Sequence, residues 1–346
     1  MVTARDVATR AGTSTAVVSY VFNNGPRNVS PALRERVLGA AAELDYRPNM
    51  LAQALSFGRT ASVGLIVPDI ANPFFGELAR SLQKAALHRD QLLLIGDAGL
   101  DPSTEARIIS SFVARRVDSA VIVSVLDRPD LTAFERAGIP VVALHPVAAD
   151  ASASSVTIDY EQAAEDAAAH LIEHGYDDIG LLNSPAGSIG GAQHLAGFTR
   201  AVARAGRSIT TSVRNSTIAR GEAAAGAIDW LSGPDRPRAI SCATDEQALG
   251  VLHAADRLGL RVPDDLAVIG FDGTAQGAYS VPPLTSVKQP LGELAARALD
   301  ILARAEGSEP VVEQLPHSLV TRASCGRHVG VGAGDERASA RIIEGP

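Results

Sequence analysis

The chain has few of the residues and patterns that mark secreted, metal-binding or membrane-spanning proteins. It contains only two cysteines, Cys242 and Cys325, in 346 residues, and their spacing matches no metal-binding motif. We therefore expect two reduced thiols in a reducing compartment. The first residues lack the apolar stretch of a signal peptide, and no apolar run approaches the roughly 20 residues needed to span a membrane. These absences predict a cytoplasmic protein with no membrane partner.

Motifs for catalysis and for cofactor binding are also absent. The sequence has no G-x-G-x-x-G after a first strand, no nucleophile elbow and no metal-ligand spacing. The GVGAG of residues 330–334 lacks the flanking strand and helix that a phosphate loop needs. We therefore predict no cofactor and no enzymatic activity.

The charge is unevenly distributed along the chain. The formal net charge is −8, yet residues 1–60 hold seven arginines against four acidic residues, a net charge of +3. Residues 61–346 hold 24 basic and 35 acidic residues, a net charge of −11. A small positive segment before an acidic body indicates that the first segment contacts a polyanion.

Two short helical patterns flank a tight turn at Gly12, within VTARDVATRAGTSTAVVSYVFNN (2–24). Thr3 and Asp6 have the spacing of a capping box, Gly12 supplies a left-handed residue, and Ser14 is placed to cap the second helix. The residues expected to face inward are Val7, Ala8, Ala11, Val17, Val18 and Val21. This spacing is typical of a helix-turn-helix, but it also fits a helical hairpin in an ordinary core.

A third helix and a short linker follow. Ser30 and Pro31 are typical of a helix start, and the expected apolar stripe is Leu33, Val37, Leu38, Ala41 and Leu44. Asn49 is placed to cap a further helical stretch, MLAQALSF (50–57), which stops at Gly58. That stretch is too short to be stable alone in water, so we expect it to order on a partner.

Apolar strands alternating with helical segments begin at residue 62. The expected strands are 62–67, 91–96, 119–124 and 140–144, then 177–183, 208–214, 239–243 and 266–272, with a last strand at 313–322. Continuously apolar strands are buried on both faces, as in parallel sheets. The fold predicted is a small all-α head plus an α/β body of two doubly wound, Rossmann-like subdomains, with a ligand between them.

Several stretches occur in a defined order along the chain. They are DVATRAGTSTAVVSYVFN (6–23), VSPALRERVLGAAAELDYRPN (29–49), VGLIVPDIANPFF (63–75), ATDEQALGVLHAADRLGLRVPDDLAVIGFDG (243–273), PPLTSVKQP (282–290) and SLVTRAS (318–324). With them the sequence resembles the LacI/GalR family of bacterial transcription regulators over residues 2–325. The resemblance implies a helix-turn-helix DNA-binding head at 1–48 and a hinge helix or linker at 49–60. It also implies an effector-binding and dimerisation core at 61–325 of the periplasmic-binding-protein-like type I fold. The tail at 326–346 lacks apolar periodicity, and we expect it to be disordered.

The resemblance assigns DNA contacts to the head. The second helix would enter the major groove with Thr15, Ala16 and Tyr20 on base edges. Phosphate contacts would come from Thr3, Ser14, Ser19 and Asn23, and Asn28 and Asn49 complete the predicted set. Tyr20 departs from the family, which frequently has Arg at this position. The alternative to a base contact is that Tyr20 packs on the third helix.

The linker resembles the hinge helix of the family. Two hinge helices of a homodimer would lie in the minor groove of a roughly palindromic operator, with Leu55 wedged into the central base step. An ordinary apolar helix face is the alternative explanation for Leu55.

The resemblance also assigns effector contacts to the core. Phe74 and Phe75 are placed to stack on a sugar or base ring, and Asp245 and Asp272 to accept hydrogen bonds from hydroxyl groups. The alternatives are a helix N-cap for Asp245 and a structural role for Asp272. His194, Ser216 and Thr244 complete the predicted site.

Departures at these positions affect the choice of effector. His194 stands where many relatives have Arg, Ser216 where some have an aromatic residue, and Thr244 where Asn is usual. Losing a fixed guanidinium weakens the case for an anionic effector or a tightly clamped sugar, and His194 could also be a structural residue. The effector hypotheses are, in order, a small polyol or sugar, a nucleobase, and no effector.

The function predicted is a sequence-specific regulator, most often a repressor, whose operator affinity a small molecule changes. Two other classes share the body fold. A solute-binding protein is disfavoured by the positive head, and an enzyme by the missing motifs.

Overall fold

The computed structural model describes residues 2–23, 28–47, 59–148, 153–304 and 309–326. The chain divides into two compact units, residues 1–61 and 62–346, called here the head and the core. Asn49 and Leu55 lie outside the described residues, as does nearly all of the predicted tail. None of the described helices is long and apolar enough to cross a membrane.

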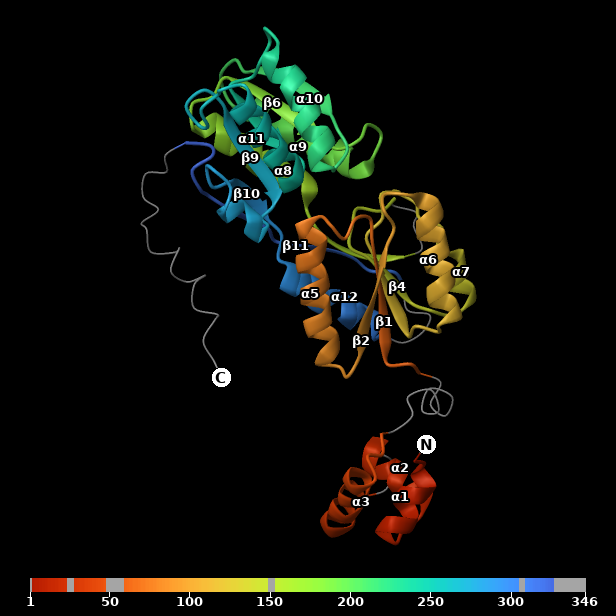
Figure 1. Cartoon of the computed structure of the whole chain (residues 1–346). Helices are drawn as coiled ribbons and strands as arrows, with labels where there is room; N and C mark the ends of the chain where they lie inside the picture. Colours follow the sequence, from red (N-terminus) through yellow and green to blue (C-terminus); the bar gives the residue numbers. More distant parts are fainter. Residues whose placement is uncertain (1, 24–27, 48–58, 149–152, 305–308, 327–346) are drawn as a thin grey trace. The chain divides into compact units, whose positions relative to one another are not determined.

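The head consists of three short helices around one small core (Figure 1). They are α1 (Ala4–Ala11), α2 (Thr15–Asn23) and α3 (Pro31–Glu43). Gly12 ends α1 in the left-handed region with φ 62°, as predicted. The Ser14 hydroxyl oxygen accepts a hydrogen bond from the Val17 backbone nitrogen at 3.3 Å, which confirms the cap on α2.

Packing among the three helices confirms most of the predicted inward residues. The buried cluster is Val7, Ala8, Ala11, Val18, Val21, Val37, Ala40 and Ala41. The interpretation of Leu38 was wrong, because its side chain is 43% exposed while Ala40 is buried instead. Ala40 lies three residues after Val37 and faces the same side of α3, whereas Leu38 is turned by about 100° from Val37.

The first half of the core, lobe 1, is built on a six-stranded parallel sheet in the order β11-β5-β4-β3-β1-β2. Its strands are β1 (Ser62–Val67), β2 (Leu92–Asp97), β3 (Ser119–Ile122), β4 (Val141–Ala143), β5 (Ser154–Ile158) and β11 (Val312–Leu315). Helices α5 (Pro73–Leu87) and α12 (Leu291–Leu302) cover one face. Helices α6 (Pro102–Ala114) and α7 (Thr132–Arg136) cover the other (Figure 1).

Lobe 2 repeats this plan with a sheet in the order β12-β10-β9-β8-β6-β7. Its strands are β6 (Asp178–Asn183), β7 (Thr210–Asn215), β8 (Ala239–Cys242), β9 (Ala267–Asp272), β10 (Thr285–Lys288) and β12 (Ser318–Val320). Only β12 is antiparallel to its neighbour. Helices α8 (Tyr160–Glu173) and α9 (Ile189–Arg204) cover one face, and α10 (Arg220–Ser232) and α11 (Asp245–Arg257) the other. The predicted α/β fold with two parallel-sheet subdomains is confirmed.

The chain passes between the two lobes three times. It passes from β5 to α8, from β10 to α12, and from β11 to β12. The expectation of one strand at 313–322 was therefore wrong, because β11 and β12 belong to different sheets. The strands β5 and β10 were not predicted.

Close packing in lobe 2 depends on one glycine. A Cβ atom at Gly197 would lie 2.0 Å from the Glu161 carbonyl oxygen and 2.8 Å from the Glu165 backbone nitrogen. Gly197 therefore sets how closely α9 approaches α8.

Candidate DNA-binding face and effector site

Helix α2 has one buried and one exposed side. Val18 and Val21 are in the head core, while Thr15, Ala16 and Ser19 are exposed. The exposed side chains are small or polar, so a large partner can approach the helix closely. Three of the residues predicted to contact DNA thus lie on the exposed side of α2.

The other described DNA-site predictions surround this helix. The Asp6 carboxylate accepts hydrogen bonds from the Thr3 backbone nitrogen and hydroxyl, both at 2.8 Å, and these bonds lower the pKa of Asp6. Tyr20 is half-buried, and Asn28 is exposed. Asn23 is the last residue of α2, and its side chain lies outside the described part of the molecule.

In the core, the two lobes meet through segments that follow the carboxyl ends of their strands. Asp127, after β3, accepts a hydrogen bond from the Ile189 backbone nitrogen at the start of α9. Glu77, in α5 after β1, accepts one from the Ala275 nitrogen at 2.8 Å, after β9. This is the edge at which open α/β sheets bind ligands.

The structure places Asp245 in a hydrogen-bond network inside lobe 2. Its carboxylate accepts bonds from the Thr274 nitrogen at 2.7 Å, the Thr274 hydroxyl at 2.8 Å and the Ser286 hydroxyl at 2.5 Å. Burial raises the pKa of Asp245 to about 6. The helix cap is Thr244, whose hydroxyl oxygen accepts a bond from the Gln247 nitrogen at 3.1 Å.

Asp272, at the end of β9, is held in a strained conformation. Its φ is +122°, a region that side-chain-bearing residues rarely adopt, and such strain gathers at functional sites. The Gln289 amide donates to its carboxylate at 2.9 Å. Burial and the neighbouring Asp245 charge raise the pKa of Asp272 well above its usual value. Two carboxyl groups thus lie close together at the end of the sheet.

His194 lies in an aromatic setting beside this pair. Its ring is edge-on to Tyr160 and Phe271, with centroid distances of 5.6 Å and 4.5 Å. Burial lowers the pKa of His194 to about 4, so the imidazole is neutral at physiological pH.

The remaining predicted effector residues are spread over both lobes. Phe74 and Phe75 lie in lobe 1, where they are buried in the core and contact each other edge-on at 5.2 Å. Ser216 follows β7, and its nitrogen donates to the Asn183 carbonyl oxygen at 3.0 Å. Gln247 donates to the same oxygen at 3.1 Å, which brings Ser216 near the start of α11.

Several polar residues at this edge were missed by the sequence analysis. Buried side-chain atoms with no hydrogen-bond partner among the described residues include His145 Nε2, Gln193 Oε1 and Gln247 Oε1. Buried polar groups without partners are rare, and they mark places where a ligand can bond. His145 follows β4 and Asp127 follows β3, so the rule of the carboxyl strand ends could have found both.

Comparison with known proteins assigns the chain to a family. A family model of bacterial regulatory proteins, lacI family, matches residues 3–49, and a periplasmic binding protein-like domain matches residues 168–325. Catabolite control protein A of Priestia megaterium is 36% identical over 336 residues, which cover 93% of this chain and 99% of that protein. The chain belongs to the LacI family of bacterial regulatory proteins.

Solved structures of transcriptional regulators agree with this fold. The lac repressor dimer bound to operator and the anti-inducer ONPF has a TM-score of 0.81 and 27% identity, covering 94% of this chain and 99% of that one. The transcriptional regulator CelR–cellobiose complex has a TM-score of 0.69 and 28% identity, covering 94% and 100%. The chain is therefore a DNA-binding transcriptional regulator, and the relatives it resembles are regulators rather than enzymes.

Proposed function

We propose that this LacI-family protein is a cytoplasmic repressor that binds a roughly palindromic operator as a homodimer. A small neutral polyol or sugar bound between the lobes would change its affinity for that operator. The observation that carries the proposal is the exposed side of α2, with Thr15, Ala16 and Ser19 on a closed three-helix core.

The roles of individual head residues follow from their positions. Thr15, Ala16 and Tyr20 would contact base edges in the major groove, and Ser14 and Ser19 would contact phosphates. The backbone amides at the start of α2 would add favourable contacts to a phosphate.

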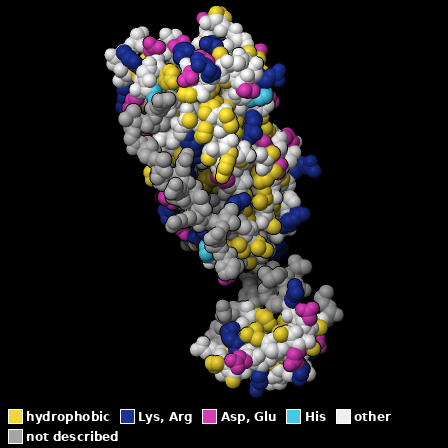
Figure 2. All heavy atoms as spheres, turned by 60° about the vertical axis from the view of Figure 1, so that its left-hand side comes forward, with side chains coloured by type: hydrophobic (Ala, Val, Ile, Leu, Met, Phe, Trp, Pro, Cys, Tyr) yellow, Lys and Arg dark blue, Asp and Glu magenta, His cyan; other side chains and the backbone are white. Residues whose placement is uncertain are grey.

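Exposed apolar surface on the core supports a dimer. The edge strand β2 has Leu92, Leu94 and Ile95 exposed by 61%, 36% and 49%, and an uncovered apolar edge invites association. Patches of hydrophobic side chains are visible on the face of the core in Figure 2.

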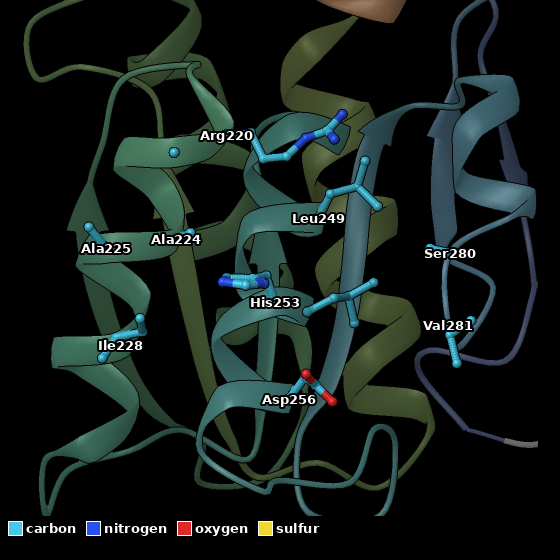
Figure 3. Close-up of a pocket in the computed structure, with 11 residues that line it drawn as sticks. Arg220, Ala224, Ala225, Ile228, Leu249, His253, Asp256, Ser280 and Val281 are labelled. Atoms are coloured by element: carbon cyan, nitrogen blue, oxygen red, sulfur yellow. The ribbon is translucent and has the colours of Figure 1, made fainter.

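A groove in lobe 2 offers a second exposed apolar surface. Figure 3 shows Ala225 and Ile228 on α10, Leu249 on α11, and Val281 on the loop after β9. Val281 is 93% exposed, and its neighbour Tyr279 is 85% exposed. We assign the second copy of this chain to β2 and this groove. The similar lac repressor is a dimer in its operator complex, which supports a dimer of this chain.

The dimer assignment is tested by charge substitution. Leu92→Asp and Val281→Asp are each expected to shift the mass measured by light scattering from dimer to monomer. Val213→Asp is the matched control, because Val213 is 40% exposed on β7, the edge strand of the other sheet. A dimer that survives both substitutions, or that all three disrupt, contradicts the assignment.

The proposed effector site is the edge where the lobes meet. The Asp272 carboxylate offers an acceptor, and His145 Nε2 and Gln193 Oε1 are buried atoms without a hydrogen-bond partner among the described residues. The Tyr160 ring, which packs against His194 and Phe271, would add an apolar surface. His194, which stands where many relatives have arginine, is neutral at physiological pH, which suits an uncharged ligand. The cellobiose complex of the similar CelR supports a carbohydrate. Binding would shift the balance between lobe arrangements.

A DNA-binding titration tests the regulator. Labelled DNA flanking the protein's own gene, followed by fluorescence anisotropy at increasing salt, should bind more tightly than random DNA. The logarithm of the protein's affinity for this DNA should fall linearly with the logarithm of the salt concentration, because phosphate contacts release counterions. Equal binding to both DNAs, or binding unaffected by salt, contradicts the proposal.

The effector is tested by thermal shift with sugars, polyols and nucleobases. A ligand that binds the folded state raises the melting temperature by mass action. We expect a response to a sugar or polyol that Asp272→Asn abolishes. A response to nucleobases alone, or to none of these ligands, contradicts the effector assignment and leaves the DNA-binding test unaffected.

A further inference from the structure

Two histidines and one cysteine converge in lobe 2, at the far end of α8 from Tyr160. His170 lies in the last turn of α8, and His174 is the residue at which the helix ends. Cys325 follows β12 and is fully buried. One ligand atom from each of these residues lies within 4.8 Å of the other two. We propose that His170, His174 and Cys325 bind a zinc ion.

The spacing of the ligand atoms suits that ion. Zinc bonds of roughly 2.0 Å to imidazole nitrogen and 2.3 Å to sulfur, in tetrahedral geometry, place ligand atoms roughly 3.5 Å apart. The Cys325 sulfur is 3.4 Å from His170 Nε2. Residues four apart on a helix project to one side, and the two imidazole rings are 4.7 Å apart between centroids. Small side-chain rotations therefore bring the three protein ligand atoms to three corners of a tetrahedron around the ion, and a water molecule takes the fourth corner.

The ligand chemistry favours zinc over the hard cations. A thiolate with two imidazoles is a soft-to-borderline set, whereas magnesium and calcium take oxygen ligands. Binding converts the Cys325 thiol to a thiolate, and its proton leaves to solvent as the sulfur–metal bond forms. No oxidant or reductant is needed.

Neighbouring groups hold the ligands in place. The Cys325 sulfur is 3.1 Å from the Thr285 hydroxyl oxygen, which also accepts a bond from the Arg322 nitrogen. When the sulfur is a thiolate, the Thr285 hydroxyl turns to donate to it, as outer groups commonly do around metals. Gly326 has φ +125°, and a Cβ there would lie 2.9 Å from His174 Nδ1. The absence of a side chain at Gly326 lets the chain lie against this imidazole.

The site joins two parts of the chain that are distant in sequence. Helix α8 follows the first passage between lobes, and Cys325 follows the third. A bound ion would fix the end of α8 to the last described segment of the core, adding to the hydrogen bond from the Tyr176 hydroxyl to the Cys325 carbonyl oxygen. It would stabilise lobe 2 independently of DNA and effector.

Cobalt(II) is the spectroscopic probe for this site, because a cobalt–thiolate bond gives a charge-transfer absorption. Full-length protein without an affinity tag, treated with chelator, should bind one equivalent of cobalt with this band, and zinc should displace it. Cys325→Ser should remove the band. His174→Gln should weaken zinc binding by at least about tenfold. Zinc should raise the melting temperature of the wild type but not that of Cys325→Ser.

Two controls keep the test specific. Cys242→Ser removes the other buried thiol, in β8, and His253→Gln removes an exposed imidazole on α11. Both variants should bind cobalt and zinc as the wild type does. The absence of a thiolate band in the folded wild type overturns the site. An affinity for zinc that is the same in Cys325→Ser as in the wild type also overturns the site.

Discussion

Both carboxylate oxygens of Asp127 lie 3.0 Å from the backbone nitrogen of Ile189. Asp127 belongs to lobe 1 and Ile189 is the first residue of α9 in lobe 2. A helix start carries partial positive charge and unpaired N–H groups, so a carboxylate there is stabilising. One side chain of lobe 1 thus completes a helix of lobe 2. Any rearrangement of the lobes that separates these two segments must break this contact.

Replacing Asp127 by alanine should loosen this contact. A hydrogen bond to a charged group contributes about 1.5–3 kcal/mol, so amide exchange at Ile189 should become roughly 10- to 100-fold faster. Hydrogen exchange by NMR or mass spectrometry measures it. Asp130→Ala is the matched control, because Asp130 accepts a bond from the Thr132 nitrogen within its own lobe. Equal exchange at Ile189 in both variants would show that Asp127 does not join the lobes.

Because His194 is buried in its neutral form, the free energy of unfolding of the core should fall as the solution becomes acidic. The pKa of His194 is about 4 in the folded protein and 6.5 in the unfolded chain, so unfolding takes up a proton between these values. The stabilising contribution is complete above pH 6.5 and is lost as the pH falls towards 4, amounting to about 3 kcal/mol. Phenylalanine keeps an aromatic ring between Tyr160 and Phe271 but does not titrate.

The free energy of unfolding in urea, measured from pH 4 to 7, should therefore depend less on pH in His194→Phe than in the wild type. Other titrating groups contribute to both proteins and cancel in the difference. Identical curves for His194→Phe and wild type would mean that the imidazole is not buried as described.

The strands that were predicted and those that were missed differ in composition. The apolar runs of β1, β6 and β9 are buried throughout, so their hydrophobicity identifies them. The missed β5 and β10 read SSVTI and TSVK, and are polar yet largely buried. Their polar side chains find partners far along the chain, as Ser286 does with Asp245. Local composition cannot show such partners.

The sequence indicates only part of the candidate effector site. Asp245 and Asp272 follow apolar strands, which is visible in the sequence, and they lie close together in the fold. The bonds of Asp245 to Thr274 and Ser286 span 29 and 41 residues, so no local pattern indicates them. The contact of Asp127 with Ile189 spans 62 residues and two lobes, for the same reason.

Replacing Gly197 by alanine should destabilise lobe 2. The new methyl group would collide with the backbone of α8 at Glu161, where no flexible side chain can move away. Overpacking of this kind typically costs about 1–3 kcal/mol in the free energy of unfolding, which urea titration measures. Gly190→Ala, on the same helix, has no heavy atom within 4 Å of the new methyl and should gain up to about 1 kcal/mol from helix propensity. Equal stability of the two variants would contradict the close packing of α8 and α9.

Tyr20 is the residue of α2 at which the operator preference should differ from that of many relatives. An arginine can hold a guanine with two hydrogen bonds, whereas a tyrosine offers one hydroxyl and a ring edge that suits a thymine methyl. Tyr20→Ala should therefore relax base preference at one operator position per half-site, with a loss of about 1–3 kcal/mol of discrimination there. Binding to an operator library, followed by sequencing of the bound fraction, measures this at every position.

The exposed Ser19, next to Tyr20 on α2, provides the comparison for that experiment. Ser19→Ala removes a predicted phosphate contact, so it should weaken binding to all sequences alike and leave the base preferences unchanged. If Tyr20→Ala behaves in this uniform way, then Tyr20 acts through packing in the head, as its half-buried position also permits. If only one position of the operator loses its preference, the side chain contacts a base, and the affected position identifies that base.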